Sequence, residues 1–161
     1  MYIMYGGCYG VGVIAARNII QGIIHYHWPG KDAQAMSSLE VKKADVPEGK
    51  CIVVQWKDSP VFIWHRTEKQ IALAEADDNS EMRDPQTDSE RVKDKKWYVS
   101  MAVCTHLGCI PIFGAGNFKG FFCPCHGSHY DASGRARKGP APLNLQIPKY
   151  HFEDDVIVIG K

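Results

Sequence analysis

The chain has 161 residues, of which 23% are charged and 45% are hydrophobic, and its formal net charge is +1. This length and composition suit one folded domain with a short appendage. The balanced charge and the lack of a strongly basic stripe argue against nucleic-acid binding. Six cysteines are too few for a disulfide scaffold of this length, but too many to be passed over.

Residues 1–28 predict a transmembrane anchor helix. The segment is apolar, and Arg17 is its one fixed charge. Since a helix of about 20 residues crosses the hydrocarbon core of a bilayer, residues 1–24 suffice, with Arg17 snorkelling or facing a partner protein. The aromatic and histidine run at residues 25–28 is typical of a membrane interface. A cleaved secretory signal is the alternative, disfavoured because a basic region before the apolar run and a clear cleavage site are lacking.

Residues 29–38 predict a flexible hinge or linker, and residues 39–161 predict the head domain. Pro29 and Gly30 end the helical pattern, and a short run of small and polar residues follows. Beyond it, alternating or apolar β-rich runs predict strands. These runs are residues 39–43, 51–56, 61–64, 97–103 and 156–159.

Three further segments complete the predicted head. Residues 68–76 are the best candidate for a soluble helix, with Thr67 as its N-cap. Residues 77–96, dense in charges of both signs, predict a surface excursion. Residues 134–148 are rich in Gly and Pro, and predict loops with short strands. The head is therefore predicted to be mainly β, an antiparallel sandwich or barrel with one short α-helix.

Two short boxes carry metal-binding residue types. The first is CTHLGC, residues 104–109, and the second is CPCHGS, residues 123–128. They place a cysteine and a histidine in each of two matching loops, as C-x-H and C-x-x-H, and such a set can bind zinc or an iron–sulfur cluster. A four-coordinate zinc site would leave the equivalent cysteines Cys109 and Cys125 unexplained.

The region from residue 104 to residue 148 resembles the Rieske subunits of ubiquinol–cytochrome c reductases, the respiratory cytochrome bc complexes. The matching text is CTHLGC, CPCHGSHYDASGR and KGPAPLNLQIP, with shorter matches at residues 35–37, 45–50, 65–67 and 83–86. The HGSHYDASGR run and the charged excursion are closer to mitochondrial and related bacterial forms than to chloroplast ones. The resemblance implies a Rieske-type head with a small cluster-binding subdomain at about residues 103–143.

The resemblance also implies a role for each residue of the two boxes. A [2Fe–2S] cluster would be held by two cysteines on one iron and two histidines on the other, namely Cys104, Cys123, His106 and His126. The two histidines would also be the catalytic residues, and Cys109 and Cys125 would form a disulfide.

The remaining site residues implied by the resemblance surround the cluster. Ser128 would donate a hydrogen bond to a bridging sulfide, and Tyr130 would donate one to a ligand cysteine. Residues 139–142 match the family's proline loop, which covers the cluster. The remaining cofactor-binding residues are Leu107, Gly108 and Pro140.

The implied function is one-electron transfer within a quinol–cytochrome c reductase. The cluster would take an electron from ubiquinol, with proton coupling through a ligand histidine, and movement of the head would deliver it to a c-type cytochrome. The implied partners are a cytochrome b subunit, the c-type cytochrome subunit and membrane lipid, within a dimeric multi-subunit complex that contributes to proton translocation. The implied location is the mitochondrial inner membrane, single-pass, with the head in the intermembrane space; a bacterial cytoplasmic membrane with a periplasmic head is the alternative.

Histidine ligation suits this chemistry. Replacing two thiolates by neutral imidazoles makes the cluster less negative, and so raises its reduction potential. A metal-bound imidazole also becomes more acidic, which couples electron uptake to proton uptake.

Two other classes of protein share parts of the pattern. A Rieske-type oxygenase or its ferredoxin uses the same boxes, but an oxygenase needs a second iron site and a catalytic domain for which this chain has no room. A zinc-binding interaction module has no redox role and is colourless, whereas a Rieske cluster is brown-red.

Overall fold

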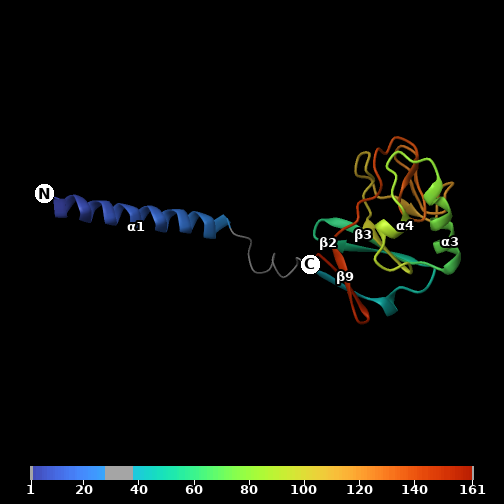
Figure 1. Cartoon of the computed structure of the whole chain (residues 1–161), viewed down its shortest axis with the longest axis horizontal. Coiled ribbons are helices and arrows are strands. Elements are labelled where there is room, and N and C mark those ends of the chain that lie inside the picture. Colours follow the sequence, from blue (N-terminus) through green and yellow to red (C-terminus); the bar gives the residue numbers. More distant parts are fainter. Residues whose placement is uncertain (1, 28–37, 161) are drawn as a thin grey trace. The chain divides into compact units, whose positions relative to one another are not determined.

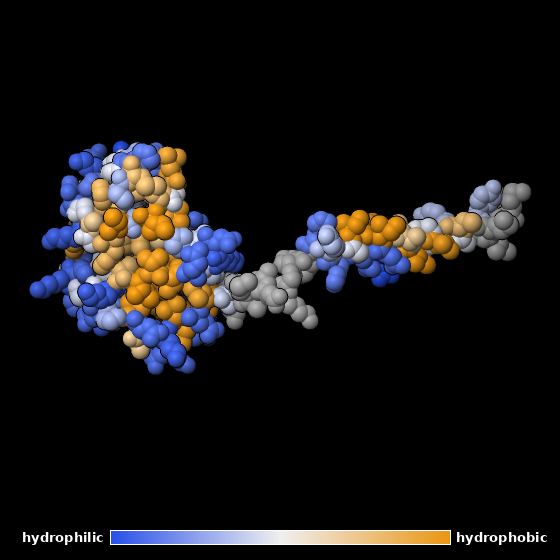
Figure 2. Space-filling model, turned by 180° about the vertical axis from the view of Figure 1, so that it is seen from behind, coloured by the Kyte–Doolittle hydropathy of each residue, from blue (hydrophilic) through white to orange (hydrophobic). Residues whose placement is uncertain are grey.

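The computed structural model describes residues 2–27 and 38–160. Residues 2–27 are the helix α1 (Tyr2–His27), and residues 38–160 form the head, a separate compact unit (Figure 1). Within α1, the stretch Tyr5–His27 is long and apolar enough to cross a membrane by length and composition, and apolar surface covers much of the helix in Figure 2. The helix predicted for the anchor is thus confirmed, while Trp28 and residues 29–37 of the predicted linker lie outside the described residues.

The head contains three antiparallel sheets, which confirms the predicted mainly-β class. The first has the order β1-β10-β9, with bounds Leu39–Lys42, Val156–Ile159 and Tyr150–Glu153. The second has the order β2-β3-β4, with bounds Cys51–Trp56, Ser59–His65 and Trp97–Met101. The third has the order β5-β6-β7-β8, with bounds Ile112–Phe113, Phe121–Cys123, Ser128–Tyr130 and Ala136–Lys138. The helical segments are η1 (Lys43–Asp45), α3 (Glu68–Ala76), η2 (Asp77–Asn79) and α4 (Asp88–Arg91).

Strand β3 lies at the centre of the head, and both of its faces are buried against apolar side chains. Val61 and Ile63 belong to the apolar cluster shared with the first sheet, whereas Phe62 and Trp64 belong to the cluster shared with the third. The alternation of side chains along a strand explains this division. The ring of Phe62 stacks on that of Phe121 in β6, with centroids 4.6 Å apart, so the third sheet is packed firmly onto the second.

Local signals correctly predicted the paired strands β2 and β3 and the helix α3. Trp56 pairs with Ser59, so the turn between β2 and β3 consists of Lys57 and Asp58, and β3 begins two residues before the run predicted at 61–64. Helix α3 begins after Thr67, whose backbone N–H donates to Oε1 of Gln70 at 2.8 Å. This is the reciprocal arrangement of a capping box.

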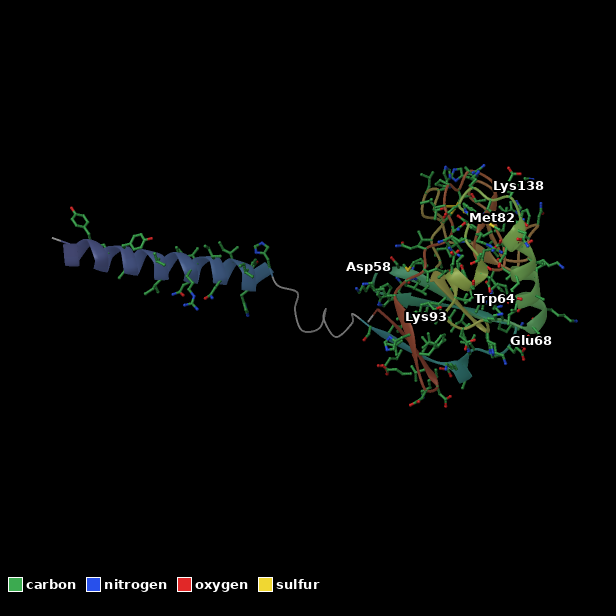
Figure 3. All side chains as sticks on the ribbon, viewed as in Figure 1. Asp58, Trp64, Glu68, Met82, Lys93 and Lys138 are labelled. Atoms are coloured by element: carbon green, nitrogen blue, oxygen red, sulfur yellow. A yellow bond between two sulfur atoms is a disulfide. The ribbon has the colours of Figure 1, made fainter. Side chains whose placement is uncertain are left out.

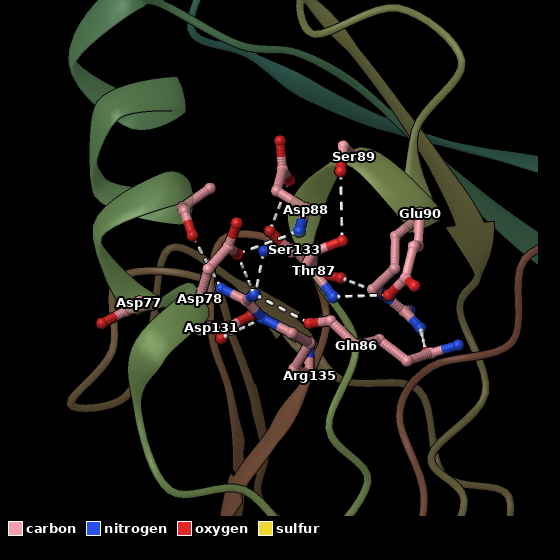
Figure 4. A network of polar contacts seen from close by, with 12 residues as sticks. Asp77, Asp78, Gln86, Thr87, Asp88, Ser89, Glu90, Asp131, Ser133 and Arg135 are labelled. Carbon is pink, nitrogen blue, oxygen red and sulfur yellow. Dashed lines mark hydrogen bonds and ion pairs between the residues drawn. The ribbon is translucent and has the colours of Figure 1, made fainter.

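The predicted surface excursion at residues 77–96 is in part buried. Nη1 of Arg66 donates to Oδ1 of Asp88 at 2.7 Å, and the Oγ of Ser133 donates to the same carboxylate at 2.5 Å. Arg135 bonds to both Asp131 and Asp78 in the same network (Figure 4). A charged residue can be buried when it is paired and hydrogen-bonded, so this segment ties the second sheet to the loops after β7.

Candidate metal centre

The two cysteine–histidine loops are closed in the same way. The carbonyl of Cys104 accepts a hydrogen bond from the N–H of Gly108 at 2.9 Å, and the carbonyl of Cys123 accepts one from Gly127 at 3.0 Å. Gly108 and Gly127 have φ angles of 84° and 71°, a region in which residues other than glycine are strained. Glycine four residues after each cysteine therefore lets both loops turn back on themselves.

The four predicted ligands are divided between the interior and the surface. Cys104 and Cys123 are 3% and 1% exposed, whereas His126 is exposed and His106 is half-buried. The two imidazole rings meet edge to face, with centroids 4.7 Å apart. Nδ1 of His106 is buried and has no hydrogen-bond partner among the described residues, and a metal ion is a partner that would satisfy it.

Tyr130 lies against the buried cysteine of the first loop. Its hydroxyl is 3.2 Å from Sγ of Cys104 and 3.3 Å from the backbone nitrogen of Thr105. Burial and the neighbouring Cys104 raise the pKa of Tyr130, which keeps the phenol protonated as a donor. Burial raises the pKa of Cys104, but hydrogen bonds from Tyr130, the His106 backbone, Cys123 and Ser128 lower it by more. Cys104 thus favours the thiolate, the form that binds metal, whereas burial and the neighbouring Cys104 raise the pKa of Cys123.

Cys109 and Cys125 form a disulfide, with their Cα atoms 6.7 Å apart, so the predicted pairing is confirmed. The sulfur atoms of Cys109, Cys123 and Cys125 lie within 4.8 Å of one another. Because the disulfide occupies two of these sulfurs, Cys123 alone of the three remains free to bind a metal. The disulfide joins the two loops beside the four predicted ligands.

The proline loop, residues 139–142, packs on the second cysteine loop. The backbone N–H of Ala141 donates to Oγ of Ser128 at 3.2 Å, and Ser128 is fully buried. Pro140 is exposed. Among the other predicted residues, Leu107 is 69% exposed at the tip of the first loop.

Some residues at the site carry no role in the sequence-based prediction. Oγ1 of Thr105 donates to the carbonyl of Leu143 at 2.7 Å, which links the first cysteine loop to the residue after the proline loop. Arg83 bonds to the proline loop itself. Thr105 belongs to the CTHLGC box, so the sequence places it near the metal centre. Nothing in the sequence around Arg83 indicates that its partner is the proline loop.

Two buried sulfurs and two imidazoles are a donor set for zinc or for an iron–sulfur cluster of mixed ligation. The histidines lie nearer the surface than the cysteines, which suits a group with one buried and one outer metal ion. The hydroxyl of Tyr130 directed at a cysteine sulfur is the kind of bond that tunes the reduction potential of a cluster. The geometry therefore favours the iron–sulfur alternative.

Comparison with known proteins agrees. The family model of the Rieske [2Fe-2S] domain matches residues 38–151. The mitochondrial Rieske subunit of the cytochrome b-c1 complex of Bos taurus is 51% identical over 152 residues, which are 93% of this chain and 56% of the bovine protein. The Saccharomyces cerevisiae subunit is 49% identical over 159 residues, 99% of this chain and 74% of the yeast protein. The chain thus spans little more than half the length of its mammalian relatives.

A solved structure shares the fold. A chain titled "Hyperthermophilic respiratory Complex III" superposes with a TM-score of 0.63 at 24% identity, covering 94% of this chain and 96% of that one. At this identity the likeness concerns the fold alone.

Proposed function

The chain belongs to the Rieske [2Fe–2S] domain family, and on that basis we propose that it is the electron-transfer subunit of a membrane quinol–cytochrome c oxidoreductase. The observation that carries the proposal is the pairing of two buried cysteines with two outer histidines in disulfide-linked loops. The donor set fits the family's [2Fe–2S] cluster, because it offers two thiolates and a buried imidazole nitrogen that needs a partner. Cys104, Cys123, His106 and His126 would hold it.

When bound, the cluster supplies a one-electron acceptor whose potential is raised by its two imidazole ligands. The protein's own groups adjust that potential. The phenol of Tyr130 donates toward Sγ of Cys104, and the buried Ser128 carries a second hydroxyl at the site. Donated hydrogen bonds stabilise negative charge on sulfur, so both hydroxyls raise the affinity for an electron.

His126 is the residue proposed to meet the quinol. Its ring is exposed, and an imidazole that binds metal through one nitrogen keeps a second nitrogen that can accept a hydrogen bond or a proton. Leu107 and Leu143 are 69% and 57% exposed near the two loops. An apolar rim around a polar acceptor suits a lipid-soluble quinol such as ubiquinol.

The electron leaves to a c-type cytochrome subunit of the same complex. We propose that α1 anchors the chain in the mitochondrial inner membrane beside a cytochrome b subunit, in a dimeric assembly with the head in the intermembrane space. The head moves between its two partners on the linker at residues 29–38, because electron transfer needs close approach to each of them.

The test is the reduction potential of the full chain, purified in detergent with its cluster, from neutral to alkaline pH. We expect a positive potential that falls as the pH rises, because the ligand histidines lose protons more readily in the oxidised state. A low potential that does not change with pH would contradict histidine ligation. A colourless protein that contains zinc would support the interaction module instead.

A further inference from the structure

The proline loop is held from outside by the chain segment before α4. Nη1 of Arg83 donates to two of its backbone carbonyls, that of Gly139 at 2.7 Å and that of Ala141 at 3.2 Å. Met82 and Lys138, the sequence neighbours of Arg83 and Gly139, lie at the same end of the head in Figure 3. One guanidinium nitrogen thus bridges both ends of the three-residue stretch 139–141.

The backbone beside Arg83 is fixed, although its own side chain is exposed. The carbonyl of Asp84 accepts a bond from Nδ2 of Asn144 at 2.8 Å, and its carboxylate accepts one from the backbone N–H of Asn144 at 3.1 Å. Asn144 is 5% exposed, so this pair of bonds is largely shielded from water. Arg83 therefore reaches the proline loop from an anchored backbone position.

The inner side of the same loop reaches the metal centre through Ser128. The N–H of Ala141 donates to Oγ of Ser128 at 3.2 Å. A hydroxyl has one proton to donate, and a donor at its oxygen leaves that proton to point away from Ala141. The backbone of Gly139 also lies directly against Ser128. A Cβ built at position 139 would be only 2.6 Å from Cα of Ser128.

We propose that Arg83 is a positioning residue of the metal centre: by holding the carbonyls of Gly139 and Ala141, it fixes the Ala141 N–H that orients the Ser128 hydroxyl. The inference rests on the proposed function, because it assigns a role toward the [2Fe–2S] cluster. Without the Arg83 bonds the loop moves more, and the Ser128 hydroxyl is less well oriented. Negative charge at the site is then less stabilised, and the potential falls.

The experiment compares three variants of the full, cluster-loaded chain with the wild type. Arg83→Met removes the donors and the charge, whereas Arg83→Lys keeps a charge and a donor able to reach a carbonyl. Lys138→Met is the matched control, because it removes one positive charge next to Gly139, and the Lys138 side chain is exposed. The readouts are the midpoint potential and the amide hydrogen exchange of residues 139–145.

We expect Arg83→Met to lower the potential more than Lys138→Met does. We also expect it to speed exchange in residues 139–145 by about threefold to tenfold, because the hydrogen bonds from Arg83 to the loop carbonyls are lost. Arg83→Lys should restore most of both properties. Equal potentials in Arg83→Met and Lys138→Met would overturn the inference, because charge alone would then explain the shift. Unchanged amide exchange in residues 139–145 of Arg83→Met would overturn it as well. A wild-type chain with a low, pH-independent potential would instead overturn the proposed function, and with it this role.

Discussion

Gly139 shows at the scale of one residue how closely the proline loop packs on the second cysteine loop. Its φ is +98°, and a Cβ at this position would lie 2.5 Å from the carbonyl oxygen of Gly127. Backbone strain and steric overlap both oppose a side chain there. We expect Gly139→Ala to lower the free energy of unfolding by about 2 kcal/mol or more, measured by urea unfolding of the full chain in detergent.

Gly114→Ala is the control for this substitution. Gly114 has a φ of +72°, but a Cβ there would meet no atom within 4 Å beyond its chain neighbours. The control therefore carries the backbone strain without the overlap, and should cost only about 1 kcal/mol. Equal losses in the two variants would show that the proline loop is not packed as tightly as the structure indicates.

The positions of the predicted ligands were accessible from sequence because each box is local. Cysteine, histidine and glycine recur there within a few residues, and the loops close through bonds between residues four apart. The roles of Thr105 and Arg83 were not accessible in this way. Their partners Leu143 and Gly139 lie 38 and 56 residues away, and sequence spacing does not encode such contacts.

At the scale of loops, the Cys109–Cys125 disulfide joins segments that are 16 residues apart in sequence. Closing a loop of that length in the unfolded chain stabilises the fold by about 3 kcal/mol in the chain-entropy account. We expect the double variant Cys109→Ser, Cys125→Ser to lose about that much stability to urea, and to release its cluster at lower urea concentration than the wild type.

Cys51→Ala serves as the control because it removes a thiol without removing a cross-link. Burial raises the pKa of the Cys51 thiol to about 12, so this thiol stays protonated and apolar in character at neutral pH. If the control lost as much stability as the double variant, the cross-link would not be the cause.

Helix α4 brings a pH-dependent contribution to stability. Burial raises the pKa of Asp88, but hydrogen bonds from Arg66 and Ser133 and the charges of Arg66 and Arg135 lower it by more, so that the net pKa is below its ordinary value of 3.8. A carboxyl with a lowered pKa contributes its full stability above the unfolded value, and loses it as the pH falls through the folded value.

We therefore expect Asp88→Asn to cost about 3 kcal/mol of unfolding free energy at neutral pH. The difference from the wild type should stay constant down to about pH 5, and shrink below pH 3.8. Unfolding free energies across that range provide the check. Glu75→Gln is the control, since the Glu75–Lys95 pair is exposed. This substitution should leave the unfolding free energy unchanged within measurement error. A difference that persisted undiminished at low pH would rule out Asp88 ionisation as its source.

The same helix explains where prediction of the elements failed. Alternation and capping signals are strong in β2, β3 and α3, which were predicted with nearly their observed bounds. Strands β5 to β8 have only two or three residues each, too few to show a period of two. The charges in residues 77–96 predicted exposure, but Asp88 and Arg91 are buried because distant groups pair with them.

At the scale of the whole molecule, the chain consists of a helix that can span a membrane and a head with its own core. The apolar run of α1 and the β pattern of the head were both readable from sequence, because each depends on local periodicity and composition. The stacking of three sheets around β3 was not, since it depends on contacts such as that between Phe62 and Phe121, which are distant in sequence.

The last prediction concerns the segment that we propose as a linker between these parts. If the head must move between a quinol site and a c-type cytochrome, stiffening residues 29–35 with several prolines should slow electron transfer through the assembled complex, because proline-rich chain is extended and semi-rigid. The cluster potential should not change, because the substitutions lie outside the head. Glycine and serine at the same positions form the matched control, since they change the sequence without adding stiffness. Turnover of the complex and the midpoint potential are measured together.

Unaltered turnover in the proline variant would count against head movement on this segment, whereas slower turnover with a lowered potential would mean that the head itself had been disturbed.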